Sequence, residues 1–125
     1  MISKFFRSRG RSFRHAFNGI ASFYKAETNA RIHLFFTTAA VFCGFLFKIS
    51  AIEWCCVLIV IGMVMTAEAI NTAIERNVDL ATLERHPLAK DAKDIAAAAV
   101  LFSAFISVIV GLLIFLPKLF AFFVR

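Results

Sequence analysis

The sequence predicts an all-α integral membrane protein, built from an N-terminal amphipathic surface helix and three transmembrane helices. The chain has 125 residues, which predicts a single domain over residues 1–125. It is 61% hydrophobic, with a mean hydropathy of +0.82, whereas soluble domains are usually about 45–50% apolar. Its long apolar segments alternate with short basic ones. These features together favour a membrane protein over a water-soluble globule.

The first 31 residues divide into two parts. Residues 1–11 place four Lys and Arg residues among Ser and Gly, which predicts a mobile basic tail. Residues 12–31 form the predicted surface helix, because apolar side chains recur there at helical spacing. These apolar residues are Phe13, Phe17, Ile20 and Tyr24. Such an Arg-rich, aromatic helix is typical of the membrane interface.

Three apolar segments follow, and we expect each to cross the membrane. They are residues 32–52, 54–75 and 95–116. A hydrocarbon core of about 30 Å needs about 20 helical residues at a rise of 1.5 Å each, so every segment is long enough. Pro87 is placed to begin the third helix ahead of its apolar part, and Pro117 follows its end.

The basic residues predict the orientation of the chain. Seven of the 14 Lys and Arg residues precede residue 32, and four more lie in residues 76–94, whereas Lys48 stands alone between the first two apolar segments. Basic residues concentrate on the cytoplasmic side of membranes. We therefore expect the N-terminus and residues 76–94 to be cytoplasmic, with the C-terminal tail outside.

The second apolar segment carries a polar face. Offsets of 3, 4, 7 and 11 residues return to nearly the same direction on a helix. The residues at these offsets are Glu68, Asn71, Thr72, Glu75 and Asp79. An ionisable residue inside a membrane helix is costly and indicates function. The alternative is a buried polar stripe that only holds helices together.

Depth separates the roles that we expect for the acidic residues. Measured along the helix from Trp54, Glu68 lies at about 21 Å and Glu75 at about 31 Å. Glu68 is therefore within the hydrocarbon, where it suits a general base for a lipid hydroxyl. Glu75 and Asp79 lie at a water-accessible level and suit the Mg²⁺ of a nucleotide. Glu27 ends the surface helix at the same level and either completes that metal site or is a solvated charge.

The polar segment before the third transmembrane helix offers candidate phosphate ligands. Lys90 and Asp94 share one helix face, as do Lys90 and Lys93, at the predicted cytoplasmic end. A charged helix end at the interface is the alternative. The sequence has no Walker loop and no kinase glycine loop.

The spaced acidic and amide residues resemble a known family. The sequence from Glu68 through Glu75, then Val78-Asp79 and Ala92-Lys93-Asp94, is similar to the prokaryotic diacylglycerol kinases, a family that includes the undecaprenol kinases. The resemblance covers about residues 12–116. It implies a homotrimer of three-span subunits, each with a surface helix, in the bacterial cytoplasmic membrane. It also implies transfer of the γ-phosphoryl group of ATP, with Mg²⁺, to a lipid hydroxyl.

The resemblance also implies roles for individual residues. Glu68 corresponds to the catalytic base, Glu27 and Glu75 to the residues that engage the metal of MgATP, and Asn71 and Asp79 to supporting residues. The implied nucleotide-binding residues also include His15, Glu84, His86, Lys93 and Asp94, with Arg85 as a neighbouring candidate. His15 replaces a Tyr of the diacylglycerol kinase branch, and residues 17–19 replace its Trp-Lys-Gly. Residues 86–90, His-Pro-Leu-Ala-Lys, resemble the undecaprenol kinase branch instead.

Three hypotheses for function follow from these observations. The leading one is a MgATP-dependent lipid kinase that acts on undecaprenol, with diacylglycerol as the alternative acceptor. The second is a non-catalytic channel or assembly subunit, whose polar face lines a pore or binds a partner. A nucleic-acid-binding function is disfavoured, because the Arg cluster adjoins a membrane helix and no base-reading module is present.

Overall fold

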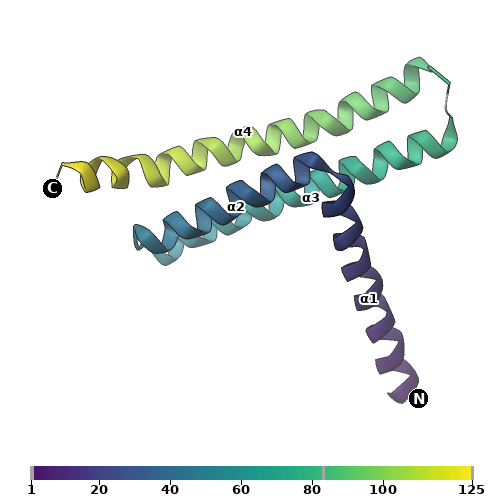
Figure 1. Cartoon of the computed structure of the whole chain (residues 1–125), viewed down its shortest axis with the longest axis horizontal. Coiled ribbons are helices and arrows are strands. Elements are labelled where there is room, and N and C mark those ends of the chain that lie inside the picture. The colour runs from purple at the N-terminus through teal and green to yellow at the C-terminus, as the bar shows by residue number, and fades with distance from the viewer. Residues whose placement is uncertain (1, 83, 125) are drawn as a thin grey trace.

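The described part of the chain consists of four helices and contains no strand. A computed structural model describes residues 2–82 and 84–124. The helices are α1 (Ile2–Ala26), α2 (Thr28–Leu46), α3 (Ala51–Ala81) and α4 (Pro87–Phe123) (Figure 1). Three of them, α2, α3 and α4, are long and apolar enough to cross a membrane. The predictions of an all-α fold and of three helices long and apolar enough to cross a membrane are therefore confirmed for the described residues.

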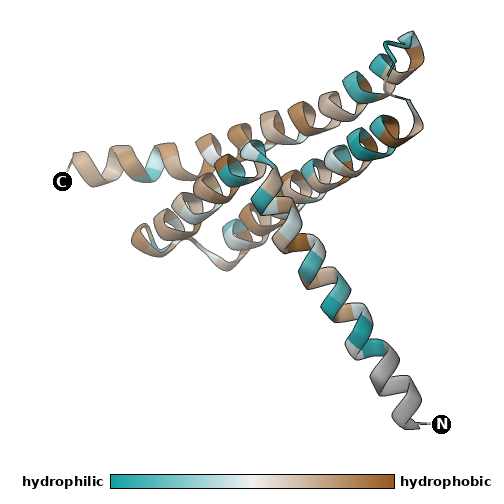
Figure 2. Cartoon of the chain, turned by 45° about the vertical axis from the view of Figure 1, so that its right-hand side comes forward, coloured by the Kyte–Doolittle hydropathy of each residue, from teal (hydrophilic) through white to brown (hydrophobic). Residues whose placement is uncertain are grey.

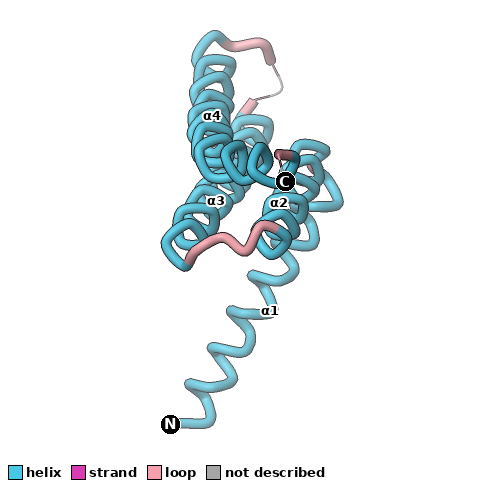
Figure 3. The backbone as a smooth tube through the Cα atoms, turned by 90° about the vertical axis from the view of Figure 1, so that its left-hand side faces the viewer, coloured by secondary structure: helices cyan, strands magenta, loops and turns pink. Residues whose placement is uncertain are grey.

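The three apolar helices lie along a common axis, whereas α1 leaves this bundle at a steep angle from the start of α2 (Figures 1 and 3). Helix α3 packs mainly against α4 and less extensively against α2. Polar residues gather along α1 and at the turn between α3 and α4, while the middle of the bundle is apolar (Figure 2). The polar turn therefore marks one end of the bundle.

Helix α3 is longer than the membrane is thick. Its 31 residues extend for about 46 Å at 1.5 Å per residue, against a hydrocarbon core of about 30 Å. The polar end of the α3–α4 hairpin therefore projects beyond the hydrocarbon. We predicted this helix over residues 54–75, and the structure extends it at both ends.

Glu27 separates α1 from α2. Its backbone is extended, with φ −102° and ψ 119°, and its carboxylate Oε1 lies 3.4 Å from Nη2 of Arg76 on α3. The surface helix therefore ends before Glu27 and not at Arg31 as expected, because a contact with another helix sets the boundary. Helix α1 also starts at Ile2, within the residues that we expected to form a mobile tail. No Pro interrupts this segment, so helix is compatible with its sequence.

The turn between α2 and α3 has two tight features. Lys48 adopts a left-handed conformation with φ 50°, and the Ile49 amide donates to the Gly44 carbonyl at 3.1 Å, which closes the end of α2 as in a Schellman motif. A Cβ added at Gly44 would lie 2.6 Å from Cη2 of Trp54. Gly44 therefore permits the close approach of the Trp54 ring to α2.

Helix α3 begins with a capping box that our sequence analysis missed. The Ser50 hydroxyl accepts from the Glu53 amide at 3.3 Å, and the Glu53 carboxylate accepts from the Ser50 amide at 2.7 Å. This reciprocal pair satisfies two backbone donors that a helix start would leave unpaired. The Ser-x-x-Glu spacing was the signal for a start at Ala51.

Helix α4 begins at Pro87 as predicted, with His86 as its N-cap. Its end differs from the expectation, because the helix continues through Pro117 to Phe123 and does not stop at residue 116. Lys118 Nζ lies 2.9 Å from Glu53 Oε1 at the start of α3. This ion pair joins the turn after Pro117 to the α3 capping box.

Candidate active site

The predicted polar face of α3 is buried within the bundle. Glu68 is 2% exposed, Asn71 7% and Thr72 5%, and they follow Val57 and Val64 on the same side of the helix. Glu68 is the largest fully buried side chain among the described residues. A carboxylate is rarely buried to this degree without a partner or a function.

Two helices surround the Glu68 carboxylate with polar groups. His33 and Asn29 approach it from α2, and Glu27 and Glu75 also lie within electrostatic range. The structure therefore brings together the three carboxylates that our sequence analysis assigned to catalysis and metal binding. His33 and Asn29 were not among the predicted site residues. No local sequence signal places them beside Glu68, because their approach depends on how α2 packs on α3.

Asn71 connects two of the predicted residues and leaves one atom open. Its Nδ2 donates to Oε1 of Glu75 at 3.0 Å, one helical turn away. Its Oδ1 is buried and accepts no hydrogen bond among the described residues. An unsatisfied buried acceptor costs about 1–3 kcal/mol. A hydrogen-bond donor from a ligand would remove that cost.

Glu27 and Glu75 fit the metal of a bound nucleotide. The described residues contain no group of three His, Cys, Asp or Glu side chains that would hold a metal ion by themselves. Mg²⁺ in phosphoryl-transfer sites, however, commonly takes one or two carboxylates, with phosphate and water oxygens as its other ligands. Glu27 is partly exposed, with a side-chain exposure of 28%, and Glu75 is half-buried. Two accessible carboxylates near Glu68 therefore suit MgATP better than a metal ion alone.

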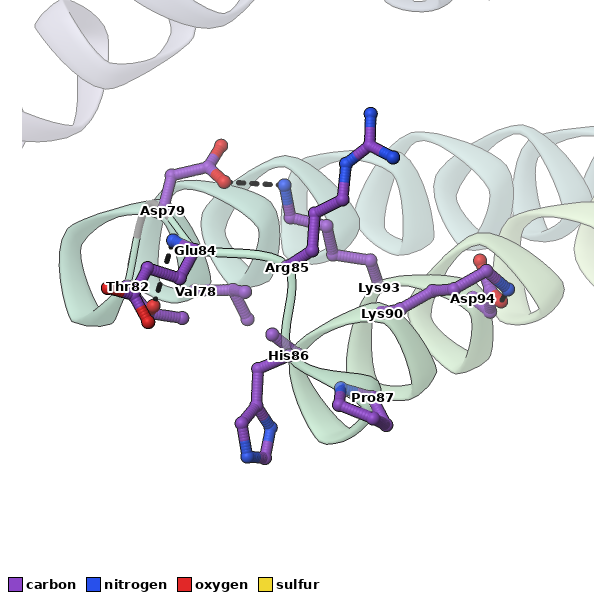
Figure 4. Close-up of a pocket in the computed structure, with 11 residues that line it drawn as sticks. Val78, Asp79, Thr82, Glu84, Arg85, His86, Pro87, Lys90, Lys93 and Asp94 are labelled. Atoms are coloured by element: carbon purple, nitrogen blue, oxygen red, sulfur yellow. Dashed lines mark hydrogen bonds and ion pairs between the residues drawn. The ribbon is translucent and has the colours of Figure 1, made fainter.

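A cavity of about 720 Å³ lies at the polar end of the α3–α4 hairpin (Figure 4). Most of the predicted nucleotide-binding residues line it, although the chain brings them from two helices and the turn between them. They are Glu84, Arg85, His86, Lys93 and Asp94, and the predicted supporting residue Asp79 lines the cavity as well. In Figure 4 the side chains of Arg85 and His86 point to opposite sides of the turn. A cavity of this size and polarity is suitable for a small phosphorylated ligand.

The two lysines of this cavity are paired with acidic groups. Lys93 Nζ contacts Asp79 Oδ1 at 2.5 Å across the hairpin, and Lys90 Nζ contacts Asp94 Oδ2 at 2.5 Å along α4. The predicted shared face of Lys90 and Asp94 is thus confirmed. A phosphate group that binds Lys93 must replace Asp79 as its partner.

Three of the predicted nucleotide-binding residues do not line this cavity: Glu27 and Glu75, which lie near Glu68, and His15. His15 is exposed on α1, which extends away from the bundle (Figure 3). Within one chain, His15 therefore does not line the cavity at the α3–α4 turn.

Comparison with known proteins identifies the family. Residues 14–115 match the sequence profile of the family described as prokaryotic diacylglycerol kinase. The chain belongs to this family. It is a prokaryotic lipid kinase, and with three membrane-crossing helices it is a multi-pass bacterial membrane protein. The hypothesis of a non-catalytic membrane subunit is therefore abandoned.

Three relatives show how the similarity is distributed. The chain is 48% identical over 118 residues to undecaprenol kinase of Bacillus subtilis (strain 168). The aligned residues cover 94% of this chain and 93% of that protein. It is 40% identical over 109 residues to a diacylglycerol kinase of Synechocystis, covering 86% of this chain and 62% of that protein. A diacylglycerol kinase of Pseudomonas aeruginosa is 33% identical over 81 residues, or 65% of this chain and 66% of that protein.

Proposed function

We propose that this lipid kinase phosphorylates undecaprenol with MgATP. The observation that supports this acceptor most strongly is the 48% identity, over nearly the whole of both chains, to an undecaprenol kinase. The resemblance of residues 86–90 to the same branch agrees with it. Diacylglycerol is the second candidate, because other relatives at 40% and 33% identity are diacylglycerol kinases.

In the proposed reaction, Glu68 is the catalytic base. The carboxylate takes the proton of the acceptor hydroxyl as the hydroxyl oxygen bonds to the γ-phosphorus, and the bond from that phosphorus to the bridging oxygen breaks to release ADP. Burial at 2% exposure keeps bulk water away from the carboxylate, so that water competes less with the alcohol. Asn71 supports the site by holding Glu75 through its 3.0 Å hydrogen bond.

MgATP is bound by Glu27 together with residues of α3 and α4. Glu27 and Glu75 would hold Mg²⁺, which neutralises charge on the phosphates when it is bound. Lys93 contacts the phosphate chain after it exchanges Asp79 for a phosphate oxygen. Glu84, Arg85, His86 and Asp94 line the rest of the nucleotide cavity, and His15 reaches it from α1 of a neighbouring subunit.

The proposal includes an orientation and an assembly. The N-terminal segment and the α3–α4 turn lie on the cytoplasmic side, where ATP is present. The Glu27–Arg76 ion pair supports this, since it joins both segments at one end of the bundle. The subunits assemble as a homotrimer, as the family resemblance implies, and His15, which does not line the cavity of its own chain, supports a site shared between subunits.

A side-by-side assay tests the acceptor. Purified protein in mixed micelles receives labelled ATP together with either undecaprenol or diacylglycerol at equal mole fraction. We expect phosphate to appear on undecaprenol at a rate at least tenfold above that on diacylglycerol, and Glu68→Gln to abolish both reactions. A higher rate on diacylglycerol would replace undecaprenol with the second candidate.

A further inference from the structure

Arg76 is a cation of α3 that directly follows the proposed metal ligand Glu75 in the sequence. Its Nη2 donates to Oε1 of Glu27, the second proposed ligand, at 3.4 Å, and its side chain is 49% exposed. Arg76 does not line the cavity at the α3–α4 turn. Its guanidinium is therefore directed at Glu27 and not at the residues proposed to hold the nucleotide.

The position of Glu27 in the chain does not by itself orient its carboxylate. Glu27 is the N-cap of α2, where a side chain often accepts from the first amides of the helix, but it makes no such bond. Arg31, in the first turn of α2, donates to the Thr28 hydroxyl at 3.0 Å instead. Within the described residues, Arg76 is thus the one side chain that donates to the Glu27 carboxylate.

The two proposed metal ligands are held in the same way. Asn71 donates to Oε1 of Glu75 at 3.0 Å, as Arg76 donates to Oε1 of Glu27. The Oε2 atom of each carboxylate accepts no hydrogen bond from the part of the chain that the structure describes. Carboxylates that bind metals are commonly oriented by such an outer hydrogen bond. The arrangement therefore leaves one oxygen of each carboxylate for a metal ion.

The contact with Arg76 joins two segments that are otherwise weakly linked at this level. Glu27 lies in the break between α1 and α2, whereas Glu75 lies within α3. The Tyr24 hydroxyl of α1 also contacts α3, at 3.8 Å from Sδ of Met65, but a thioether is a weak acceptor. The contact with Arg76 is one between opposite charges, which is stronger than a neutral one. Because Arg76 is next to Glu75, it fixes Glu27 relative to the other ligand.

We propose that Arg76 is a positioning residue, which holds the Glu27 carboxylate beside Glu75 so that both can bind the metal of MgATP. The proposal rests on the proposed function, which makes these two carboxylates the metal ligands. Arg76 acts through Glu27 and does not contact the phosphates. Its loss should therefore weaken the metal-dependent part of nucleotide binding and leave the metal-independent part unchanged.

Equilibrium binding measures this metal-dependent part without turnover. The affinity of the purified protein for a non-hydrolysable ATP analogue is determined with saturating Mg²⁺ and again with EDTA, and the ratio is the gain that the metal provides. Loss of an outer partner commonly costs about 10–100-fold in metal affinity. Since Arg76 is half-exposed, we expect Arg76→Gln to reduce the gain at least fivefold, and Arg76→Lys, which keeps the charge, to restore it to within twofold of the wild type.

Arg31→Gln is the matched control. It removes the same charge from a residue four positions after Glu27, but the partner of Arg31 is Thr28. We expect it to change the gain by less than twofold. Equal losses for Arg31→Gln and Arg76→Gln would show a general effect of charge and overturn the proposal, as would an unchanged gain in Arg76→Gln.

A double variant separates positioning from direct contact with phosphate. In a protein that already carries Glu27→Gln, adding Arg76→Gln should cause no further loss, because Arg76 has no carboxylate left to hold. Losses that multiply would show that Arg76 binds the phosphates itself and overturn the proposal. If the wild-type protein phosphorylates undecaprenol but these tests fail, the inference is wrong and the proposed function stands. If no lipid alcohol is phosphorylated, the proposed function itself fails.

Discussion

Lys93 on α4 and Asp79 on α3 form an ion pair across the polar end of the hairpin, with 2.5 Å between Nζ and Oδ1. The side chain of Asp79 is 58% exposed and that of Lys93 35%, so the pair contributes little to stability, in the range of about 0–1 kcal/mol for surface pairs. A pair that is weak in water and lies in the proposed nucleotide cavity can be exchanged for a phosphate contact at little cost in stability.

The first prediction follows from this exchange. Lys93→Gln should raise the KM for MgATP at least tenfold, because the phosphate chain loses a cationic contact, while the unfolding temperature should stay nearly unchanged. Lys118→Gln is the matched control, because it breaks an ion pair with Glu53 at the opposite end of the bundle. Steady-state kinetics with varied MgATP provide the measurement. A similar rise in KM for both variants would contradict a specific role for Lys93.

The second prediction separates the roles of two carboxylates on α3. Glu68→Gln should abolish phosphoryl transfer and change MgATP affinity by less than about twofold, because the amide cannot accept the hydroxyl proton. Glu75→Gln should weaken MgATP binding at least tenfold, because a proposed metal ligand is lost. Equilibrium binding of a non-hydrolysable ATP analogue with Mg²⁺ distinguishes the two. Equal losses of affinity would show that the roles are not separate.

The third prediction concerns stability at the α2–α3 turn. Gly44→Ala should destabilise the protein by about 1–3 kcal/mol, the usual cost of overpacking, because the new methyl group would lie 2.6 Å from the Trp54 ring. Gly62→Ala should instead be neutral or stabilising by up to about 1 kcal/mol, since Ala favours helix more than Gly does. Thermal unfolding in detergent would compare the two. Stabilisation by Gly44→Ala would be inconsistent with this packing.

The fourth prediction concerns orientation. A single Cys replaces either Ala51 or Ala81, the first and last residues of α3, in a background without Cys43, Cys55 and Cys56. An impermeant thiol reagent should label Ala51→Cys in intact cells, and label Ala81→Cys only after the membrane is opened. Both positions are exposed, and neither carries the capping hydroxyl of Ser50. The reverse labelling pattern would place the nucleotide cavity outside the cell and reject the proposed mechanism.

Much of this architecture could be predicted from local sequence. Periodicity placed Glu68, Asn71 and Thr72 on one buried face, and Pro87 marked the start of α4, because both signals act within one or two helical turns. The assignment of residues 28–31 to the surface helix was wrong, since they belong to α2 and the contact of Glu27 with Arg76 at this boundary joins residues 49 positions apart. The same limitation hid His33, whose relation to Glu68 depends on how α2 packs on α3. The Ser50–Glu53 capping box was local and could have been recognised.

The length of α3 relative to the hydrocarbon has a consequence for the choice of membrane. In the proposed orientation, Glu53 and Trp54 mark the outer end of the helix, so Glu68 lies at a fixed depth, about 26 Å along the axis from Ala51. The hydroxyl of a lipid alcohol, however, follows the headgroups of whatever bilayer surrounds the protein. In bilayers of longer acyl chains the hydroxyl in the cytoplasmic leaflet moves toward the cytoplasm and away from Glu68, and in shorter ones the bundle must tilt to match. The rate in reconstituted vesicles should therefore pass through a maximum as acyl-chain length increases, so that bilayer thickness by itself regulates this kinase.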